Sequence, residues 1–307
     1  MTLADQPLIN RLSDGRLQLC HGPIDLVVEA FGSCAEMDLA YQQAIAAFNT
    51  VLGDLVCELK DLRKPLQAGE VRLSECRPAL SMYRTASVYA SGYFVTPMIA
   101  VAGAVADHIL KCMTNGRSLS RAYVNNGGDI ALHLLQGECF EVGVCANMHK
   151  RTLASTVSVT HASNIRGLAT SGWRGRSHSL GIADAVTVLA TDAATADAAA
   201  TLIANAIDLP DHPNIQRSVA SDLSPDSDLG ERKVTVDVGE LTDAEVLLAL
   251  AAGKRRAQKM IDDKQIIGVY ATLNEEMFTL HEKTDGDTEF LISSTASVNT
   301  ELQLHCA

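Results

Sequence analysis

Residues 121–135 read RAYVNNGGDIALHLL, in which two runs of strand-forming residues flank a pair of glycines. Glycine readily adopts the positive φ angles that a two-residue turn between antiparallel strands requires. The stretch therefore predicts a β-hairpin with Gly127 and Gly128 at its turn and Asp129 at the rim. An ordinary turn explains the pattern, and so does a backbone that closely approaches a ligand; the sequence leaves both open.

Helical patterns precede this hairpin. Apolar residues recur at helical spacing over 36–62, and a second helical stretch covers 79–92. A third helix is predicted over 97–114, because Pro97 suits a first helical turn and Asn115-Gly116 suits an end. Residues 17–31 have strand character.

Strand patterns dominate the chain after the hairpin. Strands are predicted at 138–146, 153–160, 167–172, 184–190 and 234–239, with a hairpin at 266–282 and helices at 193–208 and 240–260. Thr242 is a plausible cap for the last helix. The order is not the regular alternation of a doubly wound sheet, so the predicted class is α+β, a mixed strand-rich core with flanking helices.

Two segments lack a clear pattern. Residues 210–233 are polar and contain three prolines, which predicts a mobile loop or a lid over a site. Residues 285–307 are weakly patterned and predict a flexible tail. The chain as a whole, 1–307, is expected to form a single unit of two joined lobes.

Composition narrows the classes of function. The chain has 307 residues, is 47% hydrophobic and carries a net charge of −12, which favours a packed core and argues against nucleic acid as a partner. No apolar run approaches the ~20 residues of a membrane span, and no secretory signal is visible. The eight cysteines form no CxxC pair, so we expect reduced thiols in a cytoplasmic protein. Whether the chain forms a homo-oligomer stays open.

The segment 169–178, ATSGWRGRSH, mixes hydroxyls, glycines and two arginines. Because the arginine fork matches carboxylate and phosphate geometry, the segment predicts a loop that binds a small anionic molecule. A solvated basic loop is the alternative. The candidate binding residues here are Thr170, Ser171, Gly172, Arg174 and Arg176, and His178 is the only nearby candidate for a catalytic proton carrier.

Asp197 and Thr201 lie four residues apart in the predicted helix 193–208 and therefore share one helix face. A carboxylate and a hydroxyl are hard oxygen ligands, which suits Mg²⁺. From the spacing alone, a polar pair on a solvated face is favoured over a metal site.

Four segments taken together resemble a known family. They are PMIAVAGAVADHI at 97–109, VNNGGDI at 124–130, LATSGWRGRSHSLGIADAVTVLA at 168–190 and ATADAAATLIANA at 194–206. In this order they are similar to uncharacterised bacterial and archaeal proteins allied to the ApbE flavin transferases. The resemblance covers about residues 80–280 and implies an ApbE-like fold.

The resemblance also implies site residues. It matches the GGD turn of these enzymes to Gly127–Asp129, their TSG to Thr170–Gly172 and their magnesium helix to Asp197 and Thr201, with a backbone carbonyl near Val101–Ala102 as third ligand. Two departures stand out. Ala102 occupies the position of a lysine, and His178 lacks the proline and the frame that follow the family's histidine.

The implied function is a Mg²⁺-assisted site for a phosphate-bearing, pterin-like or flavin-like small molecule, with FAD as the family's cofactor. The alternatives are a non-catalytic cofactor-binding protein and, third, a flavin transferase. The site is expected between the helix at 97–107, the GGD turn, the loop at 170–176 and the start of the helix at 193–208. That helix start is expected to favour anionic groups.

Overall fold

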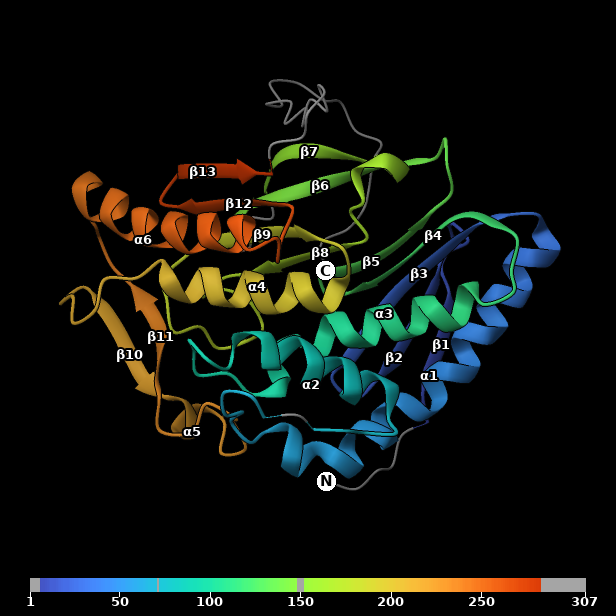
Figure 1. The fold of residues 1–307 in the computed structure, drawn as a ribbon, viewed down its shortest axis with the longest axis horizontal. Coiled ribbons are helices and arrows are strands. Elements are labelled where there is room, and N and C mark those ends of the chain that lie inside the picture. The colour runs from blue at the N-terminus through green and yellow to red at the C-terminus, as the bar shows by residue number, and fades with distance from the viewer. Residues whose placement is uncertain (1–5, 71, 148–151, 283–307) are drawn as a thin grey trace. The chain divides into compact units, whose positions relative to one another are not determined.

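The computed structural model describes residues 6–70, 72–147 and 152–282, and the ribbon of Figure 1 traces their helices and strands. The chain divides into two compact units. The first comprises Met1–Cys139, Thr160–Leu168 and Thr191–Ala198, and the second comprises Phe140–Val159, Ala169–Ala190 and Ala199–Ala307. Strand β8 (Gly167–Ser171) and helix α4 (Ala193–Ala206) each contribute residues to both units.

The sheet of the first unit is an antiparallel meander. Its strands are β1 (Leu8–Arg11), β2 (Leu17–His21), β3 (Ile24–Gly32), β4 (Leu119–Asn126) and β5 (Asp129–Leu134), each paired with the next. Gly167 and Leu168 of β8 then pair with β5. Buried and half-buried residues alternate along β3, which shows one face of the meander turned to the core.

Helices α1 (Cys34–Leu62) and α3 (Val101–Thr114) pack on this sheet, and α2 (Arg77–Tyr89) packs on these two helices. Helix α1 is capped by Ser33 and buries apolar side chains at helical spacing. Helix α2 follows, and the short 3₁₀ turn η1 (Pro97–Ala100) leads into α3. Because α3 packs on β4 and β5, its first turn lies against the glycine hairpin's sheet.

The second unit also combines strands and helices. Strands β9 (Ala185–Ala190), β12 (Gly268–Leu273) and β13 (Glu276–His281) are antiparallel neighbours, and β6 (Cys139–Asn147) pairs with β7 (Thr152–Thr160). Helix α6 (Asp243–Asp262) starts with a capping box between Thr242 and Glu245, which confirms the predicted cap. Helices with largely antiparallel strands confirm the α+β class.

The prediction that 210–233 is a loop is wrong for much of that segment. It contains strand β10 (Ile215–Val219), which pairs with β11 (Lys233–Val238), and the short helix α5 (Ala220–Leu223). Arg217 explains why a strand forms here, because its guanidinium donates hydrogen bonds to Asp208, to Thr235 and to the Leu180 carbonyl. Polar contacts replace the apolar anchors that the sequence lacks. Mobility of the segment stays a prediction.

The sequence also predicted a flexible C-terminal tail, no membrane-spanning helix and reduced cysteines. The predicted tail, 285–307, lies outside the described residues. Within the described ranges, no helix is long and apolar enough to cross a bilayer. Six described cysteines are free thiols, among them Cys20, Cys76 and Cys112.

Candidate functional site in the first unit

Helices α3 and α4 meet at their first turns inside the first unit. Gly103 of α3 is the residue that permits this contact, because a Cβ added there would lie 2.2 Å from the carbonyl oxygen of Ala193. One turn later, the Asp107 carboxylate accepts hydrogen bonds from the backbone amides of Ala193 (3.0 Å) and Ala194 (2.9 Å). Burial raises the pKa of Asp107 to about 7, although both amides favour its charged form.

Asp197 of α4 makes the converse contact with α3. Its Oδ2 accepts the backbone amide of Gly103 at 3.0 Å, and the Ala102 amide also bonds the carboxylate. Burial and the negative charge of Asp129 both raise the pKa of Asp197, and these two amides oppose the rise. The side chain is thus a half-buried carboxylate beside a second carboxylate.

The first turn of α4 binds carboxylates of the protein itself, and the binding of an anionic ligand there stays a prediction. Asp107 takes the amides of Ala193 and Ala194, and Asp192 takes those of Thr195 through its side chain (2.7 Å) and Ala196 through its carbonyl (3.2 Å). The amides of Ala193, Ala194 and Thr195 are therefore bonded to side-chain carboxylates of the protein itself, and the Ala196 amide makes the first bond within the helix.

The glycine hairpin forms as predicted. Gly127 and Gly128 have φ angles of 64° and 111° and connect Asn126 to Asp129, which are cross-strand partners. The Gly128 amide donates to Asn125 Oδ1 at 2.8 Å, which fixes the turn from within. The pattern is thus satisfied by a tight turn, and a ligand contact at this turn stays a prediction.

Ala102 contributes through its backbone. Its carbonyl accepts a hydrogen bond of 3.0 Å from Nδ2 of the buried Asn126, and its amide bonds Asp197. These contacts use backbone atoms of position 102 and need no particular side chain there.

The donor set around Asp197 fits Mg²⁺. Two carboxylates, Asp197 and Asp129, lie within electrostatic reach of each other, and each carboxylate oxygen can accept more than the one bond that an amide supplies. The Ala102 carbonyl and the Thr201 hydroxyl, one helical turn after Asp197, are further hard oxygens. Among the described residues no group of three His, Cys, Asp or Glu side chains could hold a metal, so a cation would also need such neutral oxygens.

The predicted anion-binding loop lies in the second unit. After β8, the Gly175 amide bonds the Gly172 carbonyl at 3.0 Å, which makes a tight turn. The Arg174 guanidinium stacks on Trp173, 4.0 Å from the ring centre, and its Nε lies 3.5 Å from Asp184 Oδ1. Arg174 is therefore positioned by a carboxylate of the protein itself.

The other residues of this loop are placed differently. Thr170 Oγ1 and Thr187 Oγ1 are 2.8 Å apart in a hydrogen bond, and Ser171 ends β8. Gly172 is buried against the Asp184 carbonyl, where a Cβ would be 2.6 Å away. Arg176 and His178 are exposed. The proton-carrier role of His178 stays a prediction.

The predicted site residues are divided between the two units. Asp129, Asp197 and the glycine turn belong to the first unit, while Thr201 and the loop residues belong to the second. Asp107 and Asn126, which are not among the predicted site residues, make two of the contacts that hold the Asp197 region. The sequence signal for Asp107 was its place one turn after Gly103.

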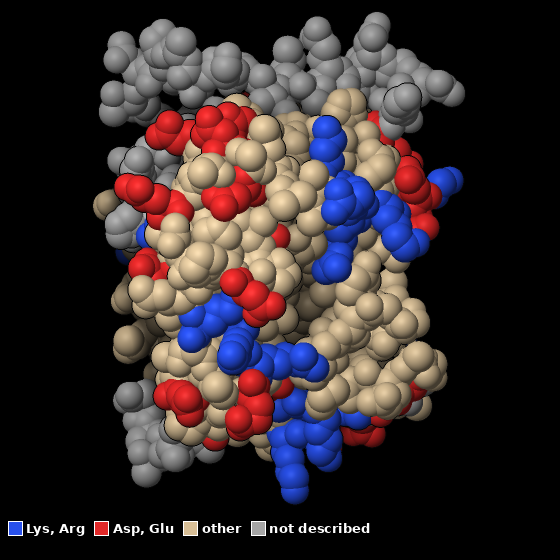
Figure 2. All heavy atoms as spheres, turned by 90° about the vertical axis from the view of Figure 1, so that its left-hand side faces the viewer, with Lys and Arg blue, Asp and Glu red and all other residues tan. Residues whose placement is uncertain are grey.

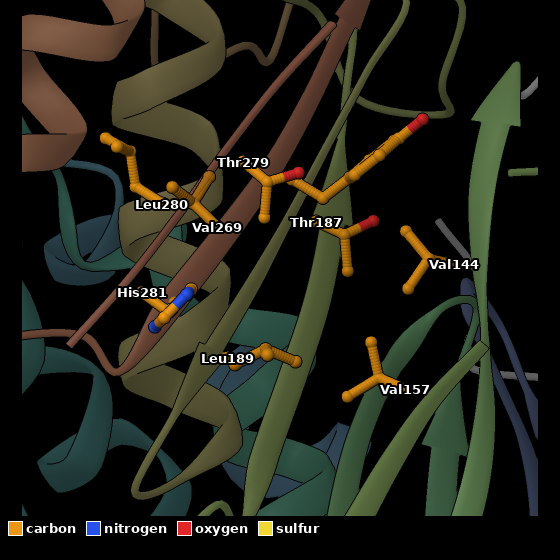
Figure 3. Close-up of a pocket in the computed structure, with 10 residues that line it drawn as sticks. Val144, Val157, Thr187, Leu189, Val269, Thr279, Leu280 and His281 are labelled. Carbon is orange, nitrogen blue, oxygen red and sulfur yellow. The ribbon is translucent and has the colours of Figure 1, made fainter. Parts of the chain in front are cut away.

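The second unit has a small cavity between β6, β7, β9, β12 and β13, of about 20 Å³ (Figure 3). Its labelled side chains are mostly apolar, such as Val144, Val157 and Leu189, and Thr187 already bonds Thr170. Space for about one water molecule in an apolar setting does not make a ligand site.

Surface charge is uneven despite the acidic composition. Figure 2 shows Lys and Arg side chains gathered in groups on one face, with Asp and Glu side chains beside them. A net charge of −12 therefore does not prevent local attraction of a small anion.

A comparison with protein families identifies the family to which this chain belongs. The profile of the family described as AbpE bacteria matches residues 9–284. The chain belongs to this family. The AbpE family match includes the glycine hairpin, α3, the loop after β8 and α4.

Two relatives of this AbpE family member come from archaea. A UPF0280 protein of Methanothermobacter thermautotrophicus is 39% identical over 150 residues, which is 48% of this chain and 56% of the relative. A UPF0280 protein of Methanothrix thermoacetophila is 40% identical over 122 residues, 39% of this chain and 49% of the relative. The chain spans about half the length of the relatives it matches.

Solved structures give a more distant likeness. The ApbE protein of Thermotoga maritima is 11% identical with a TM-score of 0.46, covering 90% of this chain and 96% of that one. The flavinyl transferase ApbE of Pseudomonas stutzeri is 11% identical with a TM-score of 0.44, covering 91% and 96%. At this distance no residue role is transferred.

Proposed function

We propose that this AbpE family member binds a phosphate-bearing small molecule of the flavin or pterin type with the help of Mg²⁺. The observation that carries the proposal is the half-buried carboxylate of Asp197, whose pKa burial and the neighbouring Asp129 both raise. Among the described residues, no lysine or arginine pairs with Asp197. A divalent cation would neutralise both carboxylates, since a nearby positive charge favours the ionised form of each.

Each part of the chain has a distinct role in this proposal. Asp197, Thr201 and the Ala102 carbonyl would hold the cation, and the cation would supply charge neutralisation for a phosphate. The Gly103 and Ala102 amides hold the Asp197 carboxylate in place. Within the first unit, Gly127 and Gly128 let a ligand approach the backbone.

Two alternatives have support of their own. The absence of the lysine at Ala102 favours a cofactor-binding protein without catalysis. The protein of Pseudomonas stutzeri is a flavinyl transferase, which raises covalent flavin transfer as the third candidate. Mass spectrometry of a threonine-containing acceptor peptide, incubated with the protein, FAD and Mg²⁺, distinguishes them, because only a transferase adds a flavin phosphate mass to the peptide.

Calorimetric titration of Mg²⁺ tests the cation site. We expect Asp197→Asn to weaken binding by about tenfold or more, because it removes a charged ligand while keeping an acceptor for the Gly103 amide. Thr201→Val should weaken binding less, because it removes a neutral ligand. The matched control is Asp243→Asn, which removes an exposed helix carboxylate in α6. Equal Mg²⁺ affinity in wild type and Asp197→Asn overturns the assignment.

Flavin binding is tested separately. The absorbance spectrum of the purified protein shows any bound flavin, and FAD is then titrated with and without Mg²⁺. The proposal expects Mg²⁺ to tighten FAD binding in wild type and to have no such effect in Asp197→Asn. FAD affinity that is the same with and without Mg²⁺ in wild type contradicts it.

A further inference from the structure

The first unit contains a second region suited to a ligand, a cavity of about 700 Å³ between α2 and α3. Helix α2 lines it with Arg77, Ser81, Arg84 and Thr85, and α3 lines it with His108 and Lys111. Small-molecule sites in proteins have volumes of roughly 300–1,000 Å³, so a nucleotide-sized molecule fits. We call this region the α2–α3 cavity.

The acidic residues of the α2–α3 cavity already have partners. Both oxygens of Asp107 accept backbone amides of α4, at 3.0 and 2.9 Å. Asp192 accepts the Thr195 amide at 2.7 Å and the Thr191 hydroxyl at 3.3 Å. These carboxylates are committed to the start of α4, and neither forms an ion pair with the basic residues across the cavity in the described part of the chain.

The basic residues of the cavity have no such partners. Arg77, Arg84 and Lys111 are exposed, and none of them forms an ion pair with any described residue. The charges of Arg77 and Lys111 both lower the pKa of His108, which burial lowers most and Asp54 opposes. Two cations on different helices therefore act on the same imidazole and on the same space. An anion in that space would relieve their mutual repulsion.

The spacing of the cations indicates the kind of anion. Arg77 and Arg84 are seven residues apart on α2, which places their backbones about 10.5 Å apart along the helix at ~1.5 Å per residue. Lys111 lies on the opposite helix. A molecule with several linked anionic groups can contact cations so spaced, whereas a single phosphate matches one of them.

We propose that the α2–α3 cavity binds a small molecule that carries two or more linked anionic groups, of the polyphosphate-ester class. The guanidiniums of Arg77 and Arg84 and the ammonium of Lys111 hold the anionic groups by charge-assisted hydrogen bonds. The site uses none of the proposed Mg²⁺ ligands, so the two proposals can be tested independently.

Titration of inorganic tripolyphosphate by calorimetry tests the site. EDTA keeps the solution free of divalent cations, and about 150 mM KCl screens attraction between exposed charges at long range. We expect Arg84→Gln and Lys111→Gln each to weaken tripolyphosphate binding by about tenfold. Arg84→Lys should lose less affinity, because lysine keeps the positive charge. Orthophosphate should bind more weakly than tripolyphosphate.

Lys60→Gln is the matched control, since it removes an exposed lysine from the last turn of α1, outside the cavity. Urea denaturation of each variant shows whether the fold is kept. The proposal is overturned if wild type does not bind tripolyphosphate, if Lys60→Gln weakens binding as much as Lys111→Gln, or if orthophosphate binds equally tightly.

A second readout locates the bound anion. The imidazole of His108 lies in the cavity wall, with its Nε2 3.9 Å from Cys112 Sγ. Its proton NMR signal, assigned as the one missing in His108→Gln, should shift when tripolyphosphate is added. Binding that leaves the His108 signal unchanged while other histidine signals shift places the anion elsewhere and rejects the proposal.

Discussion

Asp107 and Asp197 each cap the helix to which the other belongs. Asp107 of α3 accepts two amides at the start of α4, and Asp197 of α4 accepts the Gly103 amide at the start of α3. Ala100, which precedes α3, provides no side-chain cap of its own. The reciprocal contacts join two helix starts that lie far apart in the sequence and position the carboxylate proposed to bind Mg²⁺.

Asp107→Ala tests the value of this arrangement. Ala193 and Ala194 are fully buried, so the substitution leaves two buried amides without their acceptor. We expect the free energy of unfolding to fall by about 3 kcal/mol in urea denaturation. Asp107→Asn should lower the free energy of unfolding less, because its side-chain oxygen still accepts one amide. A loss below about 0.5 kcal/mol, the range of an ordinary surface substitution, would show that water replaces the carboxylate.

Gly103→Ala tests the close approach of α3 and α4. The new methyl group would overlap the Ala193 carbonyl, 2.2 Å away, so we expect destabilisation of at least about 2 kcal/mol. Gly53→Ala in α1 is the control, because nothing lies within 4 Å of its added Cβ. There alanine should stabilise the helix by about 0.5–1 kcal/mol. Equal melting temperatures of the two variants would refute the packing argument.

The two glycines of the hairpin should respond differently to asparagine. Gly127 has a φ of 64°, in the left-handed region that asparagine tolerates, so Gly127→Asn should change stability little. Gly128 has a φ of 111° and open space around its added Cβ, so the cost of Gly128→Asn is backbone strain alone, about 1–2 kcal/mol. Chemical denaturation of both variants measures the difference, and the reverse order would contradict the turn geometry.

Glu245 should make stability depend on pH in the acid range. The Thr242 amide, then His212 and the Thr242 hydroxyl, lower the pKa of Glu245 from 4.5 to about 2. A lowered carboxyl pKa stabilises the folded state above the unfolded pKa and loses that effect as the pH falls through the folded pKa. The stability difference between wild type and Glu245→Gln should be fully present just above pH 4.5 and shrink as the pH falls toward 2. A difference that stays constant over this window would exclude the linkage.

Local sequence determined the elements that depend on neighbouring residues. The glycine pair at 127–128 forms a turn, Thr242 caps α6, and the helices at 36–62 and 97–114 appear within a few residues of their predicted bounds. These features follow from φ preferences, capping and apolar spacing, which act over one or two turns of chain. Strand β10 was missed because Arg217 orders it through partners at Asp208 and Leu180.

Only the tertiary structure decided what surrounds the predicted site residues. The sequence marked Asp197 by its spacing to Thr201, but its amide partners at Ala102 and Gly103 come from a helix about ninety residues earlier. The sequence also predicted that the start of α4 would favour an anionic group. In the structure, the Asp107 carboxylate accepts the Ala193 and Ala194 amides there. Spacing along one helix reports which side chains share a face. Hydrogen bonding and burial depend on which distant segment packs against that face, and for Asp197 this packing fixes the charge environment.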